Sequence, residues 1–242
     1  MKEKLIVFVR APELGKVKTR LAKAIGDRRA LAAYKEMLGR LFGNLRYIAC
    51  LQDPLAERRS PNRRGSRGNQ CAGSETGAPS RRSLPPAANP VAVAHVELRF
   101  TPDDAGASVS AWLHPGWQLK PQGAGDLGEK LKRSFDESFQ EGFERVVIIG
   151  SDAPEVTRKD IESAWHYLRD HDVVLGPAKD GGYWLIGLRG PQPSLFEGIP
   201  WSSSAVLEQT VLRVRAAGLT GHFLRTLADI DTEEDWRQFV AQ

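Results

Sequence analysis

Residues 5–21 read LIVFVRAPELGKVKTRL, an apolar run that passes through a basic loop into a segment with helical spacing. The unbroken apolar residues 5–9 are typical of a strand buried on both faces. A proline and a glycine punctuate the loop, and the apolar positions beyond it predict helices over 19–25 and 28–42. A buried strand, a polar loop and a helix in succession are the repeating unit of α/β proteins.

The same alternation continues along the chain. Strands are predicted at 95–100, 145–149, 172–175 and 183–188, and helices at 127–143, 157–169, 203–217 and 232–240. We therefore expect an α/β protein of three layers, α/β/α, with a mostly parallel central sheet. A single domain spanning residues 1–242 accommodates these elements, interrupted by a segment of different composition at about 52–94.

That segment carries the net charge of the protein. Residues 52–94 hold seven arginines and three acidic residues, a net of 7 − 3 = +4, which equals the charge of the whole chain. The segment is rich in Pro, Ser and Gly and poor in large apolar residues, so it is predicted to be a disordered insertion. An RNA-binding role is the alternative, but no aromatic residues interleave with the arginines to stack on bases. A nucleic-acid partner is therefore not expected.

The remaining composition indicates a globular, cytoplasmic protein. Hydrophobic residues make up 41% of the chain and charged residues 26%. The apolar runs are short, as at 146–149, and fall well below the roughly 20 residues of a membrane helix. Two cysteines cannot build a disulfide framework, so a reducing compartment is the default expectation. The sequence leaves the oligomeric state open.

The loop after the first strand is a candidate phosphate-binding site. It contains four cations and a Pro/Gly turn ahead of a helix start, and its candidate contacts are Arg10, Ala11, Pro12, Gly15, Lys16, Lys18 and Arg20. Free backbone N–H groups, a positive helix end and fixed cations together suit a diphosphate or triphosphate. The spacing is not that of a P-loop. A solvated basic loop is the alternative.

Carboxylates follow the later strands. Asp152 comes directly after the strand at 145–149, where it is placed to hold Mg²⁺ or Mn²⁺ against phosphate oxygens. A turn or capping role is the alternative. Asp229 and Asp231 lie on the same side of an extended segment, so either one is a candidate second metal ligand.

A third polar cluster occupies residues 176–184. Asp180 is a candidate general base or hydroxyl-orienting group, and Gly181, Gly182 and Tyr183 are candidate contacts of a sugar or acceptor. The Asp-Gly pair also predicts a hairpin turn, and both interpretations can hold together.

Two weaker candidates lie elsewhere in the chain. Gly125 and Asp126 open a helix and are either nucleotide contacts or, for Asp126, an N-cap. Trp201 either lies near the site or packs on the helix that follows it.

These motifs occur in a fixed order that resembles a known family. They are VRAP with GKVKTRL (9–12, 15–21), GDLGE (125–129), GSDAP (150–154), GPA with DGGY (176–178, 180–183), PWS (200–202) and DIDT (229–232). From residue 4 to about 238, without the insertion, the chain resembles a bacterial glycosyltransferase family of the arsenosugar-biosynthesis type, formerly a domain of unknown function. It is also distantly similar to phospholactate guanylyltransferase.

The resemblance implies a nucleotide-diphospho-sugar transferase fold of the glycosyltransferase A type. By position it implies a metal on Asp152 and on Asp231 or Asp229, phosphates on the basic loop, and an acceptor near Asp180. The leading hypothesis is a metal-dependent glycosyltransferase that uses a nucleotide sugar and a small-molecule acceptor. The alternative is a nucleotidyltransferase that releases pyrophosphate from a nucleoside triphosphate. A third hypothesis is a non-catalytic nucleotide sensor, or an RNA-binding protein that acts through the arginine-rich insertion.

Overall fold

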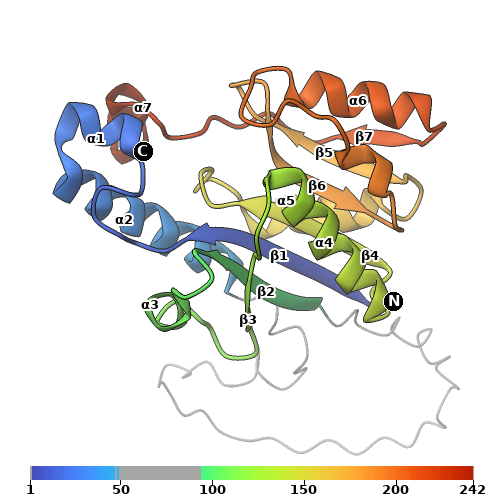
Figure 1. Ribbon diagram of the computed structural model, residues 1–242, viewed down its shortest axis with the longest axis horizontal. Coiled ribbons are helices and arrows are strands. Elements are labelled where there is room, and N and C mark those ends of the chain that lie inside the picture. The colour runs from blue at the N-terminus through green and yellow to red at the C-terminus, as the bar shows by residue number, and fades with distance from the viewer. Residues whose placement is uncertain (1, 47, 49–93, 242) are drawn as a thin grey trace, which may run out of the picture.

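The computed structural model describes residues 2–46, 48 and 94–241, and Figure 1 shows their arrangement. The predicted insertion at 52–94 lies, except for Ala94, outside the described residues. The elements are β1 (Glu3–Arg10), α1 (Thr19–Ile25), α2 (Asp27–Leu45), β2 (Ala94–Thr101), α3 (Gly106–Ser110), β3 (Gln118–Pro121), α4 (Leu127–Gln140), β4 (Arg145–Gly150), α5 (Arg158–Tyr167), β5 (Val173–Pro177), β6 (Tyr183–Leu188), η3 (Pro193–Phe196), α6 (Val206–Ala216), β7 (Gly221–Phe223) and α7 (Glu233–Val240).

All the strands and helices predicted from the sequence are present, with ends shifted by a few residues. Four short elements were not predicted: α3, β3, η3 and β7. β3 has four residues and β7 only three, and neither contains an apolar run. Such edge strands owe their conformation to the neighbouring strand, so a local pattern does not reveal them.

The seven strands form one sheet in the order β3-β2-β1-β4-β6-β5-β7. Every neighbouring pair is parallel except the two pairs made by β6, which runs antiparallel to β4 and to β5. The expectation of a mostly parallel sheet is therefore confirmed. The hairpin predicted at Asp180-Gly181 is also present, because it joins β5 to β6.

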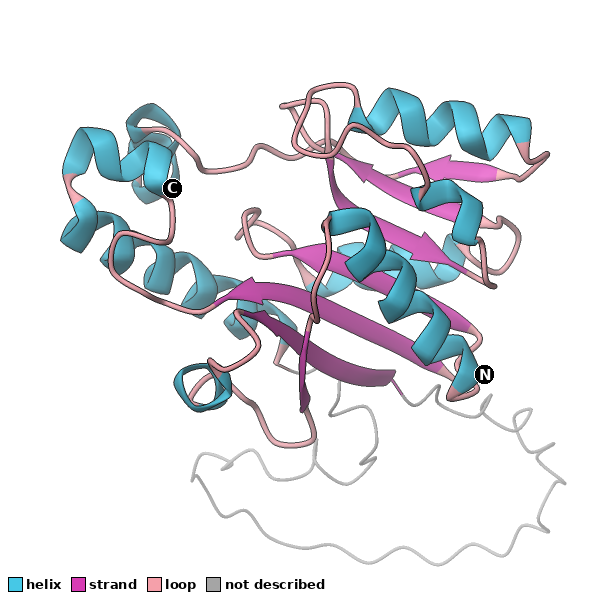
Figure 2. Ribbon diagram, viewed as in Figure 1, coloured by secondary structure: helices cyan, strands magenta, loops and turns pink. Residues whose placement is uncertain are grey.

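Two apolar cores lie on opposite faces of the sheet, and Figure 2 shows helices on both faces. Alternate residues of β1 point to the two sides, so Leu5 and Val7 join one core while Ile6 and Phe8 join the other. Helices α2 and α5 cover the first core, and α4, η3 and α6 cover the second. This confirms the three-layer arrangement.

A smaller apolar contact holds the C-terminal segment against the N-terminal one. Trp236 of α7 packs against the apolar cluster that contains Leu21 of α1 and against the one that contains Met37 of α2. The same contact brings the segment before α7 next to the loop after β1. Among the described residues, no helix has both the length and the apolar character that crossing a membrane requires.

Candidate functional site

The carboxyl edge of the sheet gathers segments that are far apart in the sequence. β1 ends at Arg10, β4 at Gly150 and β5 at Pro177, and the antiparallel strand β6 starts at the same edge with Tyr183. Ligands of open α/β sheets bind outside this edge. The basic loop, the Asp152 turn and the Asp180 hairpin therefore meet at one end of the molecule, as the sequence predicted.

Lys18 is the electrostatic centre of the basic loop. It has a left-handed backbone (φ 46°) directly before α1, and its side chain is only 3% exposed. Its ammonium lies 2.6 Å from Oδ1 of Asp152 and 3.2 Å from Oδ1 of Asp231. Burial lowers the pKa of Lys18, but the two carboxylates outweigh burial, and the pKa is raised overall. Lys18 is therefore a buried, charged group that links two carboxylates.

The other cations of the loop are closer to solvent. Arg10 donates from Nη1 to the carbonyl of Lys16 at 3.0 Å and so closes the loop. The side chain of Lys16 is 68% exposed, and its ammonium lies 2.6 Å from Oε2 of Glu13. Arg20 is 77% exposed, with Nη1 3.4 Å from Asp231. These exposed cations are available to an anion that enters from solvent.

The three small residues of the loop fix its path. Ala11 is buried and donates its N–H to the carbonyl of Thr101 at 2.8 Å, which ties the loop to the end of β2. Pro12 is half-buried, and Gly15 has a φ of 73°, a conformation that favours glycine.

Four aspartates form a cluster beside Lys18. The pKa of Asp229 is raised to about 7: burial has the largest effect, and the negative charges of Asp180, Asp152 and Asp231 add to it against the opposing effect of Lys18. The side chain of Asp152 is 57% exposed. Asp180 is exposed and accepts a hydrogen bond from the N–H of Gly182 at 2.9 Å. The four aspartates around Lys18 therefore carry more negative charge than this one ammonium balances.

The donor set fits a divalent metal completed by substrate oxygens. In the described part of the chain, no group of three or more His, Cys, Asp or Glu residues is placed to hold an ion. Asp152 and Asp231 nevertheless approach one point, because both contact the same ammonium. Mg²⁺ is commonly held by one or two carboxylates together with phosphate oxygens and water. The raised pKa of Asp229 also indicates a cluster short of positive charge.

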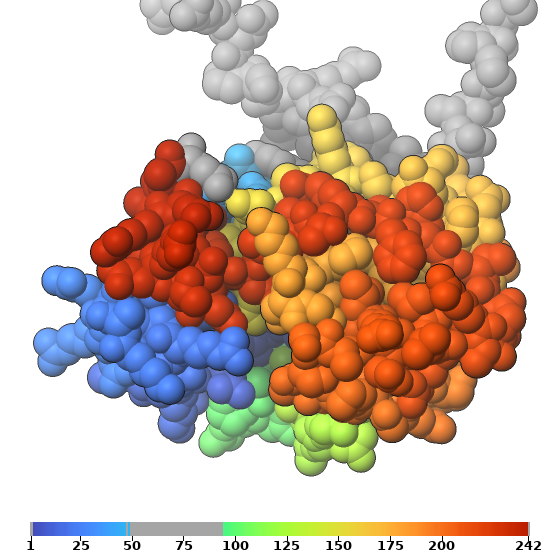
Figure 3. Space-filling view, turned by 90° about the horizontal axis from the view of Figure 1, so that it is seen from above, coloured from blue at the N-terminus to red at the C-terminus, as the bar shows by residue number. Residues whose placement is uncertain are grey.

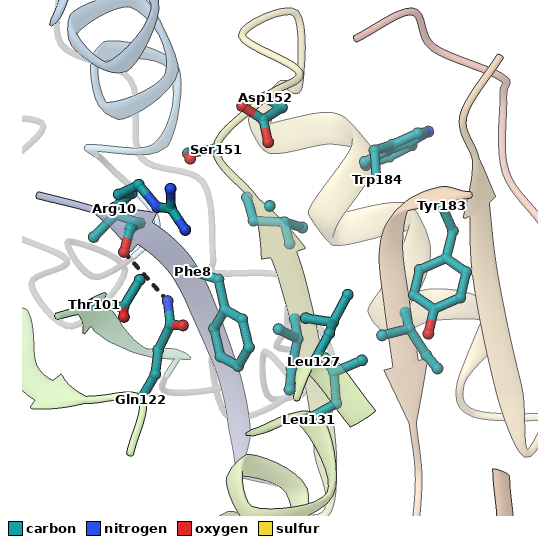
Figure 4. Close-up of a pocket in the computed structure, with 15 residues that line it drawn as sticks. Phe8, Arg10, Thr101, Gln122, Leu127, Leu131, Ser151, Asp152, Tyr183 and Trp184 are labelled. Atoms are coloured by element: carbon teal, nitrogen blue, oxygen red, sulfur yellow. Dashed lines mark hydrogen bonds between the residues drawn. The ribbon is translucent and has the colours of Figure 1, made fainter. Parts of the chain in front are cut away.

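Three adjoining cavities make up the cleft. The apolar cavity is lined by residues that include Phe8, Leu131, Ile148, Ile186, Thr101 and Gln122 (Figure 4). The cationic cavity is lined by residues that include Arg10, Lys16, Lys18, Arg20, Tyr34 and Ser151. The acidic cavity is lined by residues that include Asp180, Asp229, Asp231, Ser202, Ser203 and Ser204. Asp152 and Leu127 line all three, so the cavities are parts of a single site.

The space-filling view shows where this cleft opens. The surface is hollowed between α1 and α7, drawn in blue and red, and the orange segment that contains α6 (Figure 3). One side of the hollow includes α1, which follows the inner strand β1, and the other includes α6, which precedes the edge strand β7.

Asp126 is the N-cap of α4, and its carboxylate is engaged in capping this helix. Its side chain accepts from the N–H of Glu129 at 2.9 Å, and the Glu129 carboxylate accepts from the N–H of Asp126 at 2.8 Å. This reciprocal capping box is the role that the sequence offered as the alternative to nucleotide contact. Gly125 has a φ of 107°, and a side chain there would collide with Glu129. The residue at this helix start that lines the cleft is Leu127.

The sugar or acceptor candidates lie at different depths. Tyr183 lines the apolar and acidic cavities, but its hydroxyl is buried and points away from Asp152 (Figure 4), and burial raises its pKa. Trp201 packs its indole on Gly128 of α4, where a side chain would collide with it. Gly182 lines the acidic cavity, and Gly181 packs against the backbone of Ser204.

Tyr34 is a site residue that the sequence did not reveal. Its hydroxyl accepts from the N–H of Arg10 at 3.1 Å, donates to the Arg10 carbonyl at 2.9 Å, and lies 3.5 Å from Oγ of Ser151. It therefore ties the start of the basic loop to the turn that carries Asp152. Tyr34 falls on the apolar side of α2, so its spacing indicated only a core position.

Three comparisons relate the chain to known proteins. The model of a family described as "Uncharacterized protein conserved in bacteria (DUF2064)" matches residues 87–203. A phosphoenolpyruvate guanylyltransferase of Chloroflexus aggregans (strain MD-66 / DSM 9485) is 30% identical over 140 residues, which are 57% of this chain and 64% of that protein. The chain thus spans just under two thirds of the length of this relative.

Solved structures show the same fold. A protein of Desulfovibrio desulfuricans G20, provisionally described as a nucleotide-diphospho-sugar transferase, is 29% identical with a TM-score of 0.72 over 96% of this chain and 84% of that one. CMP:2-keto-3-deoxy-manno-octonic acid synthetase complexed with CTP is 11% identical with a TM-score of 0.53 over 100% of this chain and 98% of that one. The chain therefore has a nucleotide-diphospho-sugar transferase-like fold. The arsenosugar connection is not tested by these relatives and stays a prediction.

Proposed function

We propose that the protein is a metal-dependent nucleotidyltransferase, which transfers the nucleotide part of a nucleoside triphosphate to a small-molecule acceptor and releases pyrophosphate. The observation that carries this proposal is the cationic cavity, where Arg10, Lys16, Lys18 and Arg20 surround one space beside Asp152. A nucleoside triphosphate brings more negative charge than the diphosphate of a nucleotide sugar. Four cations next to a two-carboxylate metal site match the larger charge better.

In this reaction, different residues of the site would bind the phosphates and the metal. Lys16 and Arg20 are exposed and would neutralise the β- and γ-phosphates, while Lys18 acts from within the site. Asp152 and Asp231 would hold the divalent metal, which when bound screens charge on the phosphates. An acceptor oxygen forms a bond to the α-phosphorus as the bond from that phosphorus to the bridging oxygen breaks. The electron pair of the broken bond leaves with pyrophosphate.

The acceptor is assigned to the acidic cavity. That cavity adjoins the cationic one through Asp152 and Asp231 and carries the exposed carboxylate of Asp180. If the acceptor is a hydroxyl compound, Asp180 is the group that would take its proton. An acceptor that attacks through a phosphate or carboxylate oxygen needs no base. The guanylyltransferase of C. aggregans supports the same reaction class.

Glycosyl transfer, the leading hypothesis from the sequence, is the second candidate. One observation favours it: the acidic cavity combines Asp180 with three consecutive serines at 202–204, groups that suit sugar hydroxyls. The similarity to the D. desulfuricans protein points the same way. The two reactions differ in the leaving group, because glycosyl transfer releases a nucleoside diphosphate.

The test measures the leaving group directly. Purified protein would be incubated with each nucleoside triphosphate or nucleotide sugar, with Mg²⁺ or Mn²⁺, and with phosphorylated and hydroxyl acceptors. We expect pyrophosphate that depends on both metal and acceptor. Release of nucleoside diphosphate from a nucleotide sugar, without pyrophosphate from any triphosphate, would replace this proposal by the second candidate. Metal-independent turnover would remove Asp152 and Asp231 as ligands.

A further inference from the structure

We infer that Gln122 reads the nucleobase, by accepting a hydrogen bond from an N–H donor on the edge of the base. This inference rests on the proposed function and adds the residue that sets base preference. Gln122 follows β3 directly, is only 6% exposed and lines the apolar cavity with Thr101 and Phe8 (Figure 4).

The backbone of Gln122 is fixed from both sides. Its N–H donates to the carbonyl of Phe100 at 2.9 Å, and its carbonyl accepts from Nη1 of Arg133 at 2.6 Å. The next residue, Gly123, donates its N–H to Asp103 at 3.0 Å. A side chain that starts from so constrained a backbone can present its amide in few positions.

The amide of Gln122 has a single orientation. Nε2 donates to the carbonyl of Val9 at 3.2 Å and to the carbonyl of Arg99 at 3.0 Å. A flipped amide would place its oxygen against these two acceptors, which cannot donate. Oε1 is therefore turned toward the cavity (Figure 4), and no described residue donates a hydrogen bond to it. The cleft thus contains one rigidly held amide acceptor beside the apolar side chains of this cavity.

The surroundings of this acceptor suit a flat ring. The cavity has a volume of about 350 Å³ and is walled by apolar side chains such as Phe8, Leu131 and Ile148. It meets the cationic cavity at Arg10 and Asp152, so a nucleotide with its phosphates on the basic loop places its base here. A guanine or uracil offers a ring N–H to Oε1, and a cytosine or adenine offers an amino group. All four bases thus offer an N–H donor to Oε1, and the experiment below distinguishes which base the protein prefers.

The experiment compares triphosphates with and without a base. Binding of GTP, ATP, CTP, UTP and inorganic tripolyphosphate, each with Mn²⁺, would be measured for the wild type, Gln122→Leu and Gln118→Leu. Gln118 is exposed at the start of the same strand and provides the matched control. We expect one triphosphate to bind the wild type and Gln118→Leu at least tenfold more tightly than the other triphosphates and tripolyphosphate. In Gln122→Leu this preference should fall about tenfold, because one buried hydrogen bond is lost, while tripolyphosphate binding is unchanged.

A second measurement does not depend on the folding of a variant. The wild type would be titrated with an analogue of its preferred triphosphate that is methylated at the donor nitrogen until no N–H remains there, once for a ring nitrogen and twice for an amino group. We expect the analogue to bind no better than tripolyphosphate. An unchanged base preference in Gln122→Leu, or full affinity for the methylated analogue, would overturn the role of Gln122. Absence of binding by every triphosphate and by tripolyphosphate would instead overturn the proposed function itself.

Discussion

The molecule contains two clusters of ionic side chains, and they are built on opposite principles. Under α4, Lys4, Glu97 and Arg99 are buried and paired, with Lys4 2.8 Å from Glu97 and Arg99 2.6 Å from Glu137. At the carboxyl edge, the cluster of four aspartates has Lys18 as its only buried cation among the described residues. In the first cluster Lys4 and Arg99 balance Glu97 and Glu137. In the second, the four aspartates outnumber Lys18 and Arg20, the two described cations that form ion pairs with them.

The pKa values express this difference. Burial raises the pKa of Glu97, but its ion pairs with Arg99 and Lys4 outweigh burial, so the pKa is lowered overall. Burial also raises the pKa of Asp229, and there the neighbouring aspartates add to the effect and bring the value to about 7. Similar carboxylates therefore have opposite shifts, because one meets cations and the other meets anions. A carboxylate cluster left short of cations is characteristic of a binding site.

The largest expected effect comes from removing a charge of the carboxyl-edge cluster. Asp152→Asn keeps the shape of the side chain but removes the charge assigned to the metal. We expect metal-dependent turnover to fall by about a thousandfold, because several kcal/mol of charge stabilisation is lost. Initial rates of pyrophosphate release would measure it. Asp170→Asn, in an exposed turn after α5, is the matched control and should retain full activity. A rate for Asp152→Asn within tenfold of the wild type would exclude Asp152 as a metal ligand.

The second prediction breaks the paired cluster. Arg99→Met leaves the buried Glu97 with Lys4 alone, so we expect the free energy of unfolding to fall by about 3–5 kcal/mol. Urea denaturation would measure it. Arg158→Met removes an exposed pair with Glu162 and should cost at most about 1 kcal/mol. Equal losses in the two variants would show that burial does not distinguish these pairs.

The sequence predicts the edge of the sheet better than it predicts the site formed there. Apolar strands and the polar turns after them are local patterns, so the sequence alone identifies the segments that carry Lys18, Asp152 and Asp180. Which side chains turn inward depends on contacts between distant segments. Lys18 is buried because Asp231 returns to it from 213 residues further along the chain, and no local pattern encodes that return.

The same reason explains two other results. Gln122 becomes a rigid acceptor only when Val9 and Arg99 supply the carbonyls that hold its amide. Asp229 and Asp231 were equivalent as candidate ligands in the sequence. In the structure Asp231 contacts Lys18 and Arg20, whereas Asp229 is more buried and has the raised pKa.

The third prediction concerns the pH dependence of stability. The pKa of Asp229 is about 7 in the folded protein and near the ordinary aspartate value of 3.8 in the unfolded chain. Between these values the folded state holds the additional proton, so this group makes the free energy of unfolding fall as pH rises from about 4 to 7. Asp229→Asn should remove this fall. At pH 8 the free energy of unfolding of the variant should exceed that of the wild type by on the order of 2–4 kcal/mol. Denaturation with chelator at pH 5 and pH 8 would measure both proteins, with Asp170→Asn as control. The same pH dependence in Asp229→Asn and the wild type would refute the assignment.

The smallest expected effect tests whether Lys18 occupies the place that a metal would take. Its ammonium contacts both Asp152 and Asp231, so a divalent ion bound by these carboxylates must displace it. Lys18→Met should tighten Mn²⁺ binding without nucleotide by about tenfold, while it weakens tripolyphosphate binding by a similar factor. Arg20→Met removes an exposed cation 3.4 Å from Asp231 and should change both affinities less. Titration calorimetry would give the four constants. Weaker Mn²⁺ binding in Lys18→Met would mean that the ammonium supports the metal site and does not compete for it. In that case the metal would add its charge to that of the Lys18 ammonium when the nucleotide complex binds at the carboxyl edge. It would not replace the ammonium.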